Sequence, residues 1–212
     1  MFERWLIAKG NVFAPNWETL IKLVEKLKEE KWLVGQGTAY TTVEKGETNT
    51  EAVPDTIERP WLDDESREEL RMVWKVAADK SPLTGPASTI EIQRAPDFVY
   101  PLRKGIGPLP TECKCKEDLS FEWDEDELTP TFEKSQGIYT ECEDCSRTFD
   151  PAKGTAKLTD PVTKQTEEVP GGAAYRFAIK VTSDEPAAFG PDFLAFMAKE
   201  FNRSFYEVGA PR

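Results

Sequence analysis

The sequence predicts an α+β protein with a mostly antiparallel or mixed sheet, about three helices and a cysteine-bearing insertion. Short runs of alternating apolar and polar residues are typical of strands, and longer segments with apolar residues at helical spacing stand near both ends of the chain. The composition agrees, because 39% of the 212 residues are apolar and 11% are aromatic, which is enough to form a core.

The first elements are a strand and a helix. Residues 2–8 alternate well enough for a strand, and Asn16 is a candidate N-cap for a helix over residues 17–31. The helix is predicted because apolar residues recur at helical spacing while Glu and Lys occupy the other positions. Its apolar positions are Trp17, Leu20, Ile21, Val24 and Leu27.

A strand over residues 38–43 and a second helix are predicted next. Residues 47–59 are polar strand or loop, and Asp63 and Asp64 can cap a helix that ends near Asp79, before a proline turn. The residues expected to face inward in this helix are Leu70, Val73, Trp74 and Ala77. Two short strands, 89–93 and 97–100, complete this part of the chain.

The last third repeats the plan of the first. Residues 155–159 and 164–169 resemble a hairpin, and residues 175–181 alternate more clearly than any other segment. A helix over 191–201 and a strand over 204–208 follow. Strand, helix and strand at both ends predict ferredoxin-like elements.

The charge is negative and concentrated in one segment. The chain carries 27 Lys and Arg against 39 Asp and Glu, a net charge of −12. Residues 112–145 hold twelve carboxylates and three lysines, a net charge of −9. Such a charge repels phosphate backbones and anionic lipid, so it argues against nucleic acid or a membrane as partner and favours a basic protein.

All four cysteines of the chain lie in this acidic segment. Cys113 and Cys115 form one close pair, Cys142 and Cys145 form another, and 26 residues separate the pairs. Two close pairs of thiolates, each on one tight turn, can surround a zinc ion as a tetrahedron. The sequence therefore predicts one structural zinc ion.

Residues 111–149 resemble a zinc ribbon on these cysteines, and no family is recognised for the rest of the chain. The run from Cys142 to Phe149, Cys-Glu-Asp-Cys-Ser-Arg-Thr-Phe, resembles a zinc-ribbon knuckle followed by an aromatic strand residue. Ser146 stands where Gly often follows the last cysteine, and the first pair is Cys-x-Cys where Cys-x-x-Cys is commoner. The interpretation is an acidic zinc ribbon at 111–149, inserted into a scaffold of residues 1–110 and 150–212.

Other chemistry for the cysteines stays open. Four thiolates also suit an iron–sulfur cluster. Disulfides are disfavoured, because residues 1–10 contain no long apolar secretion segment and predict a cytoplasmic chain. A redox-active Cys-x-x-Cys would need a strand before it and a helix after it, which the sequence around Cys142 lacks.

The chain contains no histidine, which excludes every mechanism that needs imidazole. The first hypothesis is accordingly a binding protein with no catalysis, whose acidic ribbon engages a basic protein and neutralises a toxin or nuclease, as acidic immunity proteins do. The acidic run Asp124, Glu125, Asp126 and Glu127 is the candidate contact surface.

Two alternatives come from other classes. One is a hydrolase that works with a pair of carboxylates from residues such as Glu91, Asp97 or Glu58. The other is a zinc-ribbon subunit of a larger transcription or processing complex.

Overall fold

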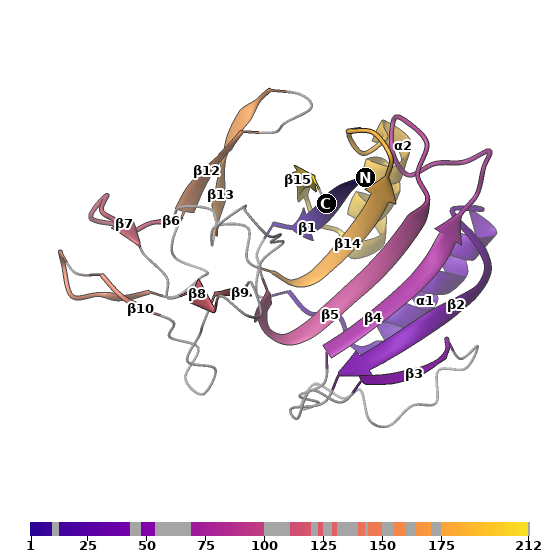
Figure 1. Ribbon diagram of the computed structural model, residues 1–212, viewed down its shortest axis with the longest axis horizontal. Coiled ribbons are helices and arrows are strands. Elements are labelled where there is room, and N and C mark those ends of the chain that lie inside the picture. Colours follow the sequence, from indigo (N-terminus) through magenta and orange to yellow (C-terminus); the bar gives the residue numbers. More distant parts are fainter. Residues whose placement is uncertain are drawn as a thin grey trace.

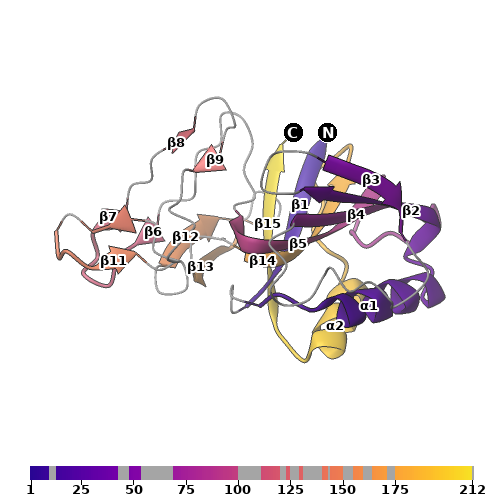
Figure 2. The same cartoon turned by 90° about the horizontal axis from the view of Figure 1, so that it is seen from below.

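The main feature of the computed structural model is a seven-stranded sheet with two helices against one face (Figures 1 and 2). The strands stand in the order β15-β1-β14-β5-β4-β2-β3, and every neighbouring pair is antiparallel. This confirms the predicted α+β class with a mostly antiparallel sheet. The structure describes residues 1–9, 13–42, 48–53, 69–99, 111–119, 123–124, 129–130, 140–142, 144–149, 155–159, 164–170 and 175–211.

The elements of this layered unit come from the two ends of the chain. They are β1 (Phe2–Ala8), α1 (Trp17–Glu29), β2 (Leu33–Thr42), β3 (Thr48–Ala52), β4 (Glu69–Val76), β5 (Thr89–Val99), β14 (Tyr175–Ser183), α2 (Pro191–Phe201) and β15 (Phe205–Pro211). The strand pairing thus joins β5 directly to β14, although 75 residues separate them in the sequence.

That connection holds the smaller strands, beside the large sheet in Figure 1. They are β6 (Thr111–Glu112), β7 (Asp118–Leu119), β8 (Trp123–Asp124), β9 (Thr129–Pro130), β10 (Thr140–Glu141), β11 (Thr148–Phe149), β12 (Thr155–Thr159) and β13 (Thr166–Pro170). A four-stranded sheet has the order β13-β12-β6-β7, and β10-β11 and β8-β9 form two ladders.

The predicted hairpin of residues 155–169 is confirmed as β12 and β13. It pairs with β6 through Thr155 and Glu112, so it belongs to the same sheet as the first cysteine turn. The division into a scaffold of 1–110 and 150–212 and an insertion of 111–149 stays a prediction.

The two helices form where their apolar residues recur at helical spacing. The side chain of Asn16 caps α1 and accepts a hydrogen bond from the Thr19 backbone N–H at 2.9 Å. Both helices bury one face on the sheet, and Trp32 meets Phe193 of α2 edge to face at a ring distance of 5.1 Å. The helix predictions over 17–31 and 191–201 are therefore confirmed within two residues.

The helix predicted over residues 63–79 is wrong for the part that the structure describes. Residues 69–76 form β4, in which Leu70, Met72 and Trp74 are buried and their immediate neighbours are not. This alternation has the period of a strand, and pairing with β2 and β5 buries all three side chains on one face. In place of the expected three helices, the described residues contain two.

The ferredoxin-like interpretation of the two ends is not confirmed. At the C-terminal end, β1 alone lies between β14 and β15, which α2 connects. At the N-terminal end, three strands separate β1 from β2. A split β-α-β unit has one strand between its two, so the N-terminal unit departs from that pattern.

A glycine in β2 makes room for the largest fully buried side chain. The register of β2 against β4 shifts between Val34 and Thr38, and Trp74 of β4 packs against the bulge. A Cβ atom on Gly37 would lie 2.1 Å from the indole Cε2 of Trp74, which is 2% exposed. The absence of a side chain at Gly37 therefore determines how β2 and β4 pack.

Gly37→Ala is expected to destabilise the protein by about 3 kcal/mol, because the added methyl overpacks a buried indole that cannot move without disturbing β4. Urea unfolding monitored by tryptophan fluorescence measures the loss. Gly85→Ala is the matched control, since its Cβ would meet only the Ala187 Cβ at an ordinary 3.5 Å. Equal stability of the two variants would contradict this packing.

Candidate metal centre

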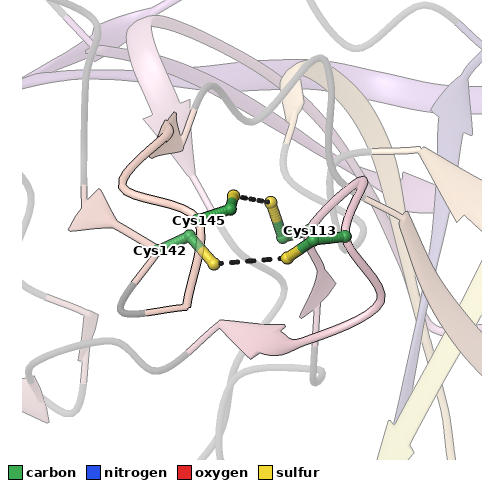
Figure 3. Close-up of side chains that lie close together, drawn as sticks. Cys113, Cys142 and Cys145 are labelled. Atoms are coloured by element: carbon green, nitrogen blue, oxygen red, sulfur yellow. Dashed lines mark hydrogen bonds between the residues drawn. The ribbon is translucent and has the colours of Figure 1, made fainter.

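Two short turns bring all four cysteines together. Cys113 and Cys115 lie in the turn between β6 and β7, and Cys142 and Cys145 lie in the turn between β10 and β11. The four sulfur atoms all lie within 4.8 Å of one another. Figure 3 shows the side chains pointing toward one another from the two facing turns. The sequence prediction that these four residues converge is confirmed.

The first turn is closed by hydrogen bonds of the Cys113 backbone. Its N–H donates to the carbonyl of Glu117 at 2.8 Å, and its carbonyl accepts from the N–H of Lys116 at 2.9 Å. Lys116, the residue after the second cysteine, has a left-handed backbone with φ of 78°. The Cys-x-Cys spacing is thus compatible with a closed knuckle.

The second turn is closed by the same pattern of backbone hydrogen bonds, with one more residue between its two cysteines. The N–H of Cys142 donates to the carbonyl of Arg147, and its carbonyl accepts from the N–H of Ser146, both at 2.8 Å. Ser146 is left-handed, with φ of 53°. The position where the sequence has Ser in place of Gly is therefore the position that needs a positive φ.

The sulfur positions fit a tetrahedral metal ion. Zinc binds thiolate sulfur at about 2.3 Å, so the edges of a regular four-sulfur tetrahedron are about 3.8 Å. The sulfurs of Cys113 and Cys145 are 3.6 Å apart, as are those of Cys115 and Cys142. A disulfide would bring two sulfurs to about 2.05 Å, and all four thiols are free. The donor set and its spacing suit zinc, and four thiolates also suit iron.

The surroundings of three of the thiols shift their pKa values in opposite directions. The backbone N–H of Cys115 hydrogen-bonds to the Cys113 sulfur and lowers the pKa of Cys113 to about 7. For Cys115, the N–H of Glu117 favours the thiolate, but burial and the neighbouring thiols outweigh it and raise the pKa to about 12. The pKa of Cys145 is also raised, because burial and the thiol of Cys113 outweigh the N–H of Arg147. A bound divalent cation would favour the thiolate form of these cysteines.

The described surface of the two turns is not itself acidic. Lys114, Lys116 and Arg147 are exposed there, together with Glu117 and Asp144. A metal ion with four thiolates carries a net charge of −2 when the ion is divalent, so these cations lie beside an anionic centre. The negative charge of the segment must come from residues outside the two turns.

The predicted partner surface lies at the margin of what the structure describes. The backbone of Asp124 lies in β8, while its side chain and residues Glu125, Asp126 and Glu127 lie outside the described residues. The structure therefore does not place this surface relative to the cysteines.

Of the three carboxylates considered for a hydrolase, Glu91 is the one whose side chain the structure describes. Glu91 is 8% exposed, and its carboxylate contacts Lys180 at 2.8 Å and Arg71 at 3.9 Å. It also accepts a hydrogen bond from Gln93 at 2.7 Å. Of the other two candidates, Glu58 and the side chain of Asp97 lie outside the described residues.

Sequence reasoning missed the ion-pair row to which Glu91 belongs. Lys180 of β14 also contacts Glu3 of β1 at 3.7 Å, so one ammonium joins two carboxylates across three neighbouring strands. Glu91 and Lys180 alternate with apolar residues in their strands, and this alternation was the available signal. Which strands are neighbours could not be read from it.

Zinc binding is expected to release at least two protons per ion at pH 7.5, from the thiols of Cys115 and Cys145, whose raised pKa values keep them protonated in the metal-free protein. Affinity should accordingly fall as the pH is lowered. Calorimetric titrations in buffers of different ionisation enthalpy measure the proton count. A heat independent of the buffer would contradict this assignment.

Ser146→Gly is expected to tighten zinc binding about fivefold, equivalent to about 1 kcal/mol, since glycine adopts the left-handed backbone without steric cost. Competition with a chromophoric chelator measures the affinity. Ser146→Ala is the control, because it removes the hydroxyl and keeps the Cβ; it should bind no more tightly than the parent. A similar gain in both variants would show that the backbone conformation is not the cause.

Comparison with protein-family models, curated proteins and solved structures found no match to this chain. The resemblance to zinc ribbons therefore rests on the four cysteines alone. Among the described residues, no helix is both long and apolar enough to cross a bilayer. What the structure establishes at this site is a four-cysteine cluster with the geometry to hold a metal ion.

Proposed function

We propose that the chain is an intracellular zinc-binding interaction protein, without catalytic activity, whose acidic segment engages a basic protein. The observation that carries the proposal is the convergence of four thiols from two facing turns inside the segment that holds most of the net negative charge. One zinc ion would tie these turns together and limit the conformations of the acidic chain between them.

The charge arithmetic supports a basic partner. Residues 112–145 contribute −9 of the total of −12, and four thiolates with one zinc ion add −2. Opposite charge on the partner would raise the association rate and make binding sensitive to salt. A nuclease or toxin that binds phosphate has a positively charged surface at that site. More specifically, we propose that the acidic segment binds such a surface and neutralises the toxin or nuclease.

The proposal includes the assignment of residues 111–149 to the zinc-ribbon family. The two equivalent turns, each closed on a left-handed residue after its second cysteine, support it. The reducing interior of the cell supports zinc over disulfides, because thiols stay available as ligands there. The contacts of Glu91 do not favour the hydrolase. The Glu91 carboxylate already binds Lys180 and accepts a hydrogen bond from Gln93.

The first test is native mass spectrometry of the untagged protein isolated from its own cells. We expect a mass increment for one zinc ion together with a stoichiometric basic protein. A chain that carries no metal would refute the zinc centre. A zinc-bound monomer with no partner, even after chemical cross-linking, would refute the interaction.

Reversing the charges of Asp124, Glu125, Asp126 and Glu127 to Lys is expected to weaken binding to the partner so identified by at least tenfold at low salt. Calorimetry or surface-based kinetics measures the affinity. The matched control reverses four carboxylates that are exposed on the layered unit and changes the net charge equally. These are Glu25, Glu29, Asp184 and Glu185.

The control variant should bind within threefold of the parent protein. An equal loss of affinity in both variants would mean that only the total charge matters. If neither variant loses affinity, residues 124–127 are not the contact surface. The double variant Cys142→Ser, Cys145→Ser adds a further comparison. If zinc organises the acidic segment, this variant loses both the metal and most of the affinity.

A further inference from the structure

Two sulfur contacts in the centre run across the two turns. Cys113 of the first turn faces Cys145 of the second, and Cys115 faces Cys142, with sulfur separations of 3.6 Å in both cases (Figure 3). Each thiol of one turn therefore contacts a thiol of the other turn. Movement of under 2 Å would bring either pair to the length of a disulfide.

Bridges across the turns would leave the backbone of both turns intact. The hydrogen bonds that close the first turn join Cys113 to Lys116 and Glu117, and none of them connects the two turns. A bridge within Cys113-Lys-Cys115 would have to form inside that three-residue segment, against the hydrogen bonds that set its shape. The geometry of the first turn therefore disfavours a bridge between Cys113 and Cys115.

The thiols also differ in access to solvent. Cys113, Cys115 and Cys145 are half-buried, whereas Cys142 is only 1% exposed. The pair formed by Cys113 and Cys145 therefore has two accessible sulfurs, and the pair formed by Cys115 and Cys142 has one. A small oxidant reaches the first pair more readily.

We propose that the four-cysteine centre is also a site of oxidation by peroxide, at which Cys113 bonds to Cys145 first and Cys115 bonds to Cys142 second, with release of the metal ion. In each step two thiolates lose two electrons and form one S–S bond. One peroxide molecule accepts the two electrons, its O–O bond breaks, and with two protons it leaves as two molecules of water.

The consequence is that the two turns stay connected in both states. The metal ion connects them when the thiols are reduced, and two bridges connect them when the thiols are oxidised. The bridge between Cys113 and Cys145 closes a long loop, which restricts the unfolded chain in the same way as the metal does. The centre loses its −2 charge and its metal without separating the turns.

The inference rests on the four-thiol centre of the proposed function and not on a basic partner. The test exposes the full-length, zinc-loaded protein to hydrogen peroxide, follows zinc release with a chromophoric indicator, and blocks remaining thiols with an alkylating agent. Metal content before oxidation is measured separately, so a chain without zinc refutes the proposed function while the bridges can still be mapped on the metal-free protein.

The sequence allows the bridges to be mapped directly. Cleavage by trypsin after Lys114 separates Cys113 from Cys115, and cleavage by a glutamyl endopeptidase after Glu143 separates Cys142 from Cys145. The four cysteines then lie on four peptides, and mass spectrometry identifies which peptides are joined. We expect the pair from Cys113 and Cys145 early and both crossed pairs at completion, with about one zinc ion released per chain.

A matched pair of variants separates the crossed arrangement from the alternatives. In Cys113→Ser, the bridge between Cys115 and Cys142 should still form, and in Cys142→Ser the bridge between Cys113 and Cys145 should still form. Bridges within the pairs, the other crossed arrangement, or sulfinic and sulfonic acids without any bridge would each overturn the proposal. Retention of zinc with four free thiols after peroxide would overturn it as well.

Discussion

The pairing of β5 with β14 is the constraint on which the arrangement of the molecule depends. Tyr175 pairs with Val99, so the 75 residues between these strands begin and end at one place in the large sheet. A segment of this length closes a long loop, and the strands described within it pair with one another and not with the large sheet. The smaller strands and both cysteine turns lie within it.

A metal ion bound by the two cysteine turns would stabilise this segment. The strands of β6 to β11 are two residues long, and two-stranded ladders of this length are too short to be stable by themselves. Two cysteine turns that share one ion add a strong link between residues that are far apart in the sequence. The buried, apolar core of the layered unit has no such need, because its helices and strands already enclose one continuous cluster.

The sequence predicts an element well where one periodicity alone is present. In α1, all residues of the predicted stripe are buried, together with Leu23, and Asn16 caps the helix as expected. In β4 two periods compete: Leu70, Val73, Trp74 and Ala77 suit a helix, but Leu70 and Trp74 together with Met72 suit a strand. Pairing with β2 and β5 makes this segment a strand. The local sequence does not show which strands will be its neighbours. The same reason hid the contact of Glu3 and Glu91 with Lys180.

The cysteines were predictable for the opposite reason, since a ligand set reveals itself by residue type and spacing wherever the turns meet. What spacing could not give was the backbone of the turns, in which Lys116 and Ser146 both take left-handed conformations. Lys114, Lys116 and Arg147 are exposed on the two turns beside Glu117 and Asp144, so the described surface of the turns has no excess of negative charge. The type and spacing of the ligands are local features of the sequence, whereas the backbone that presents them depends on the hydrogen bonds that close each turn.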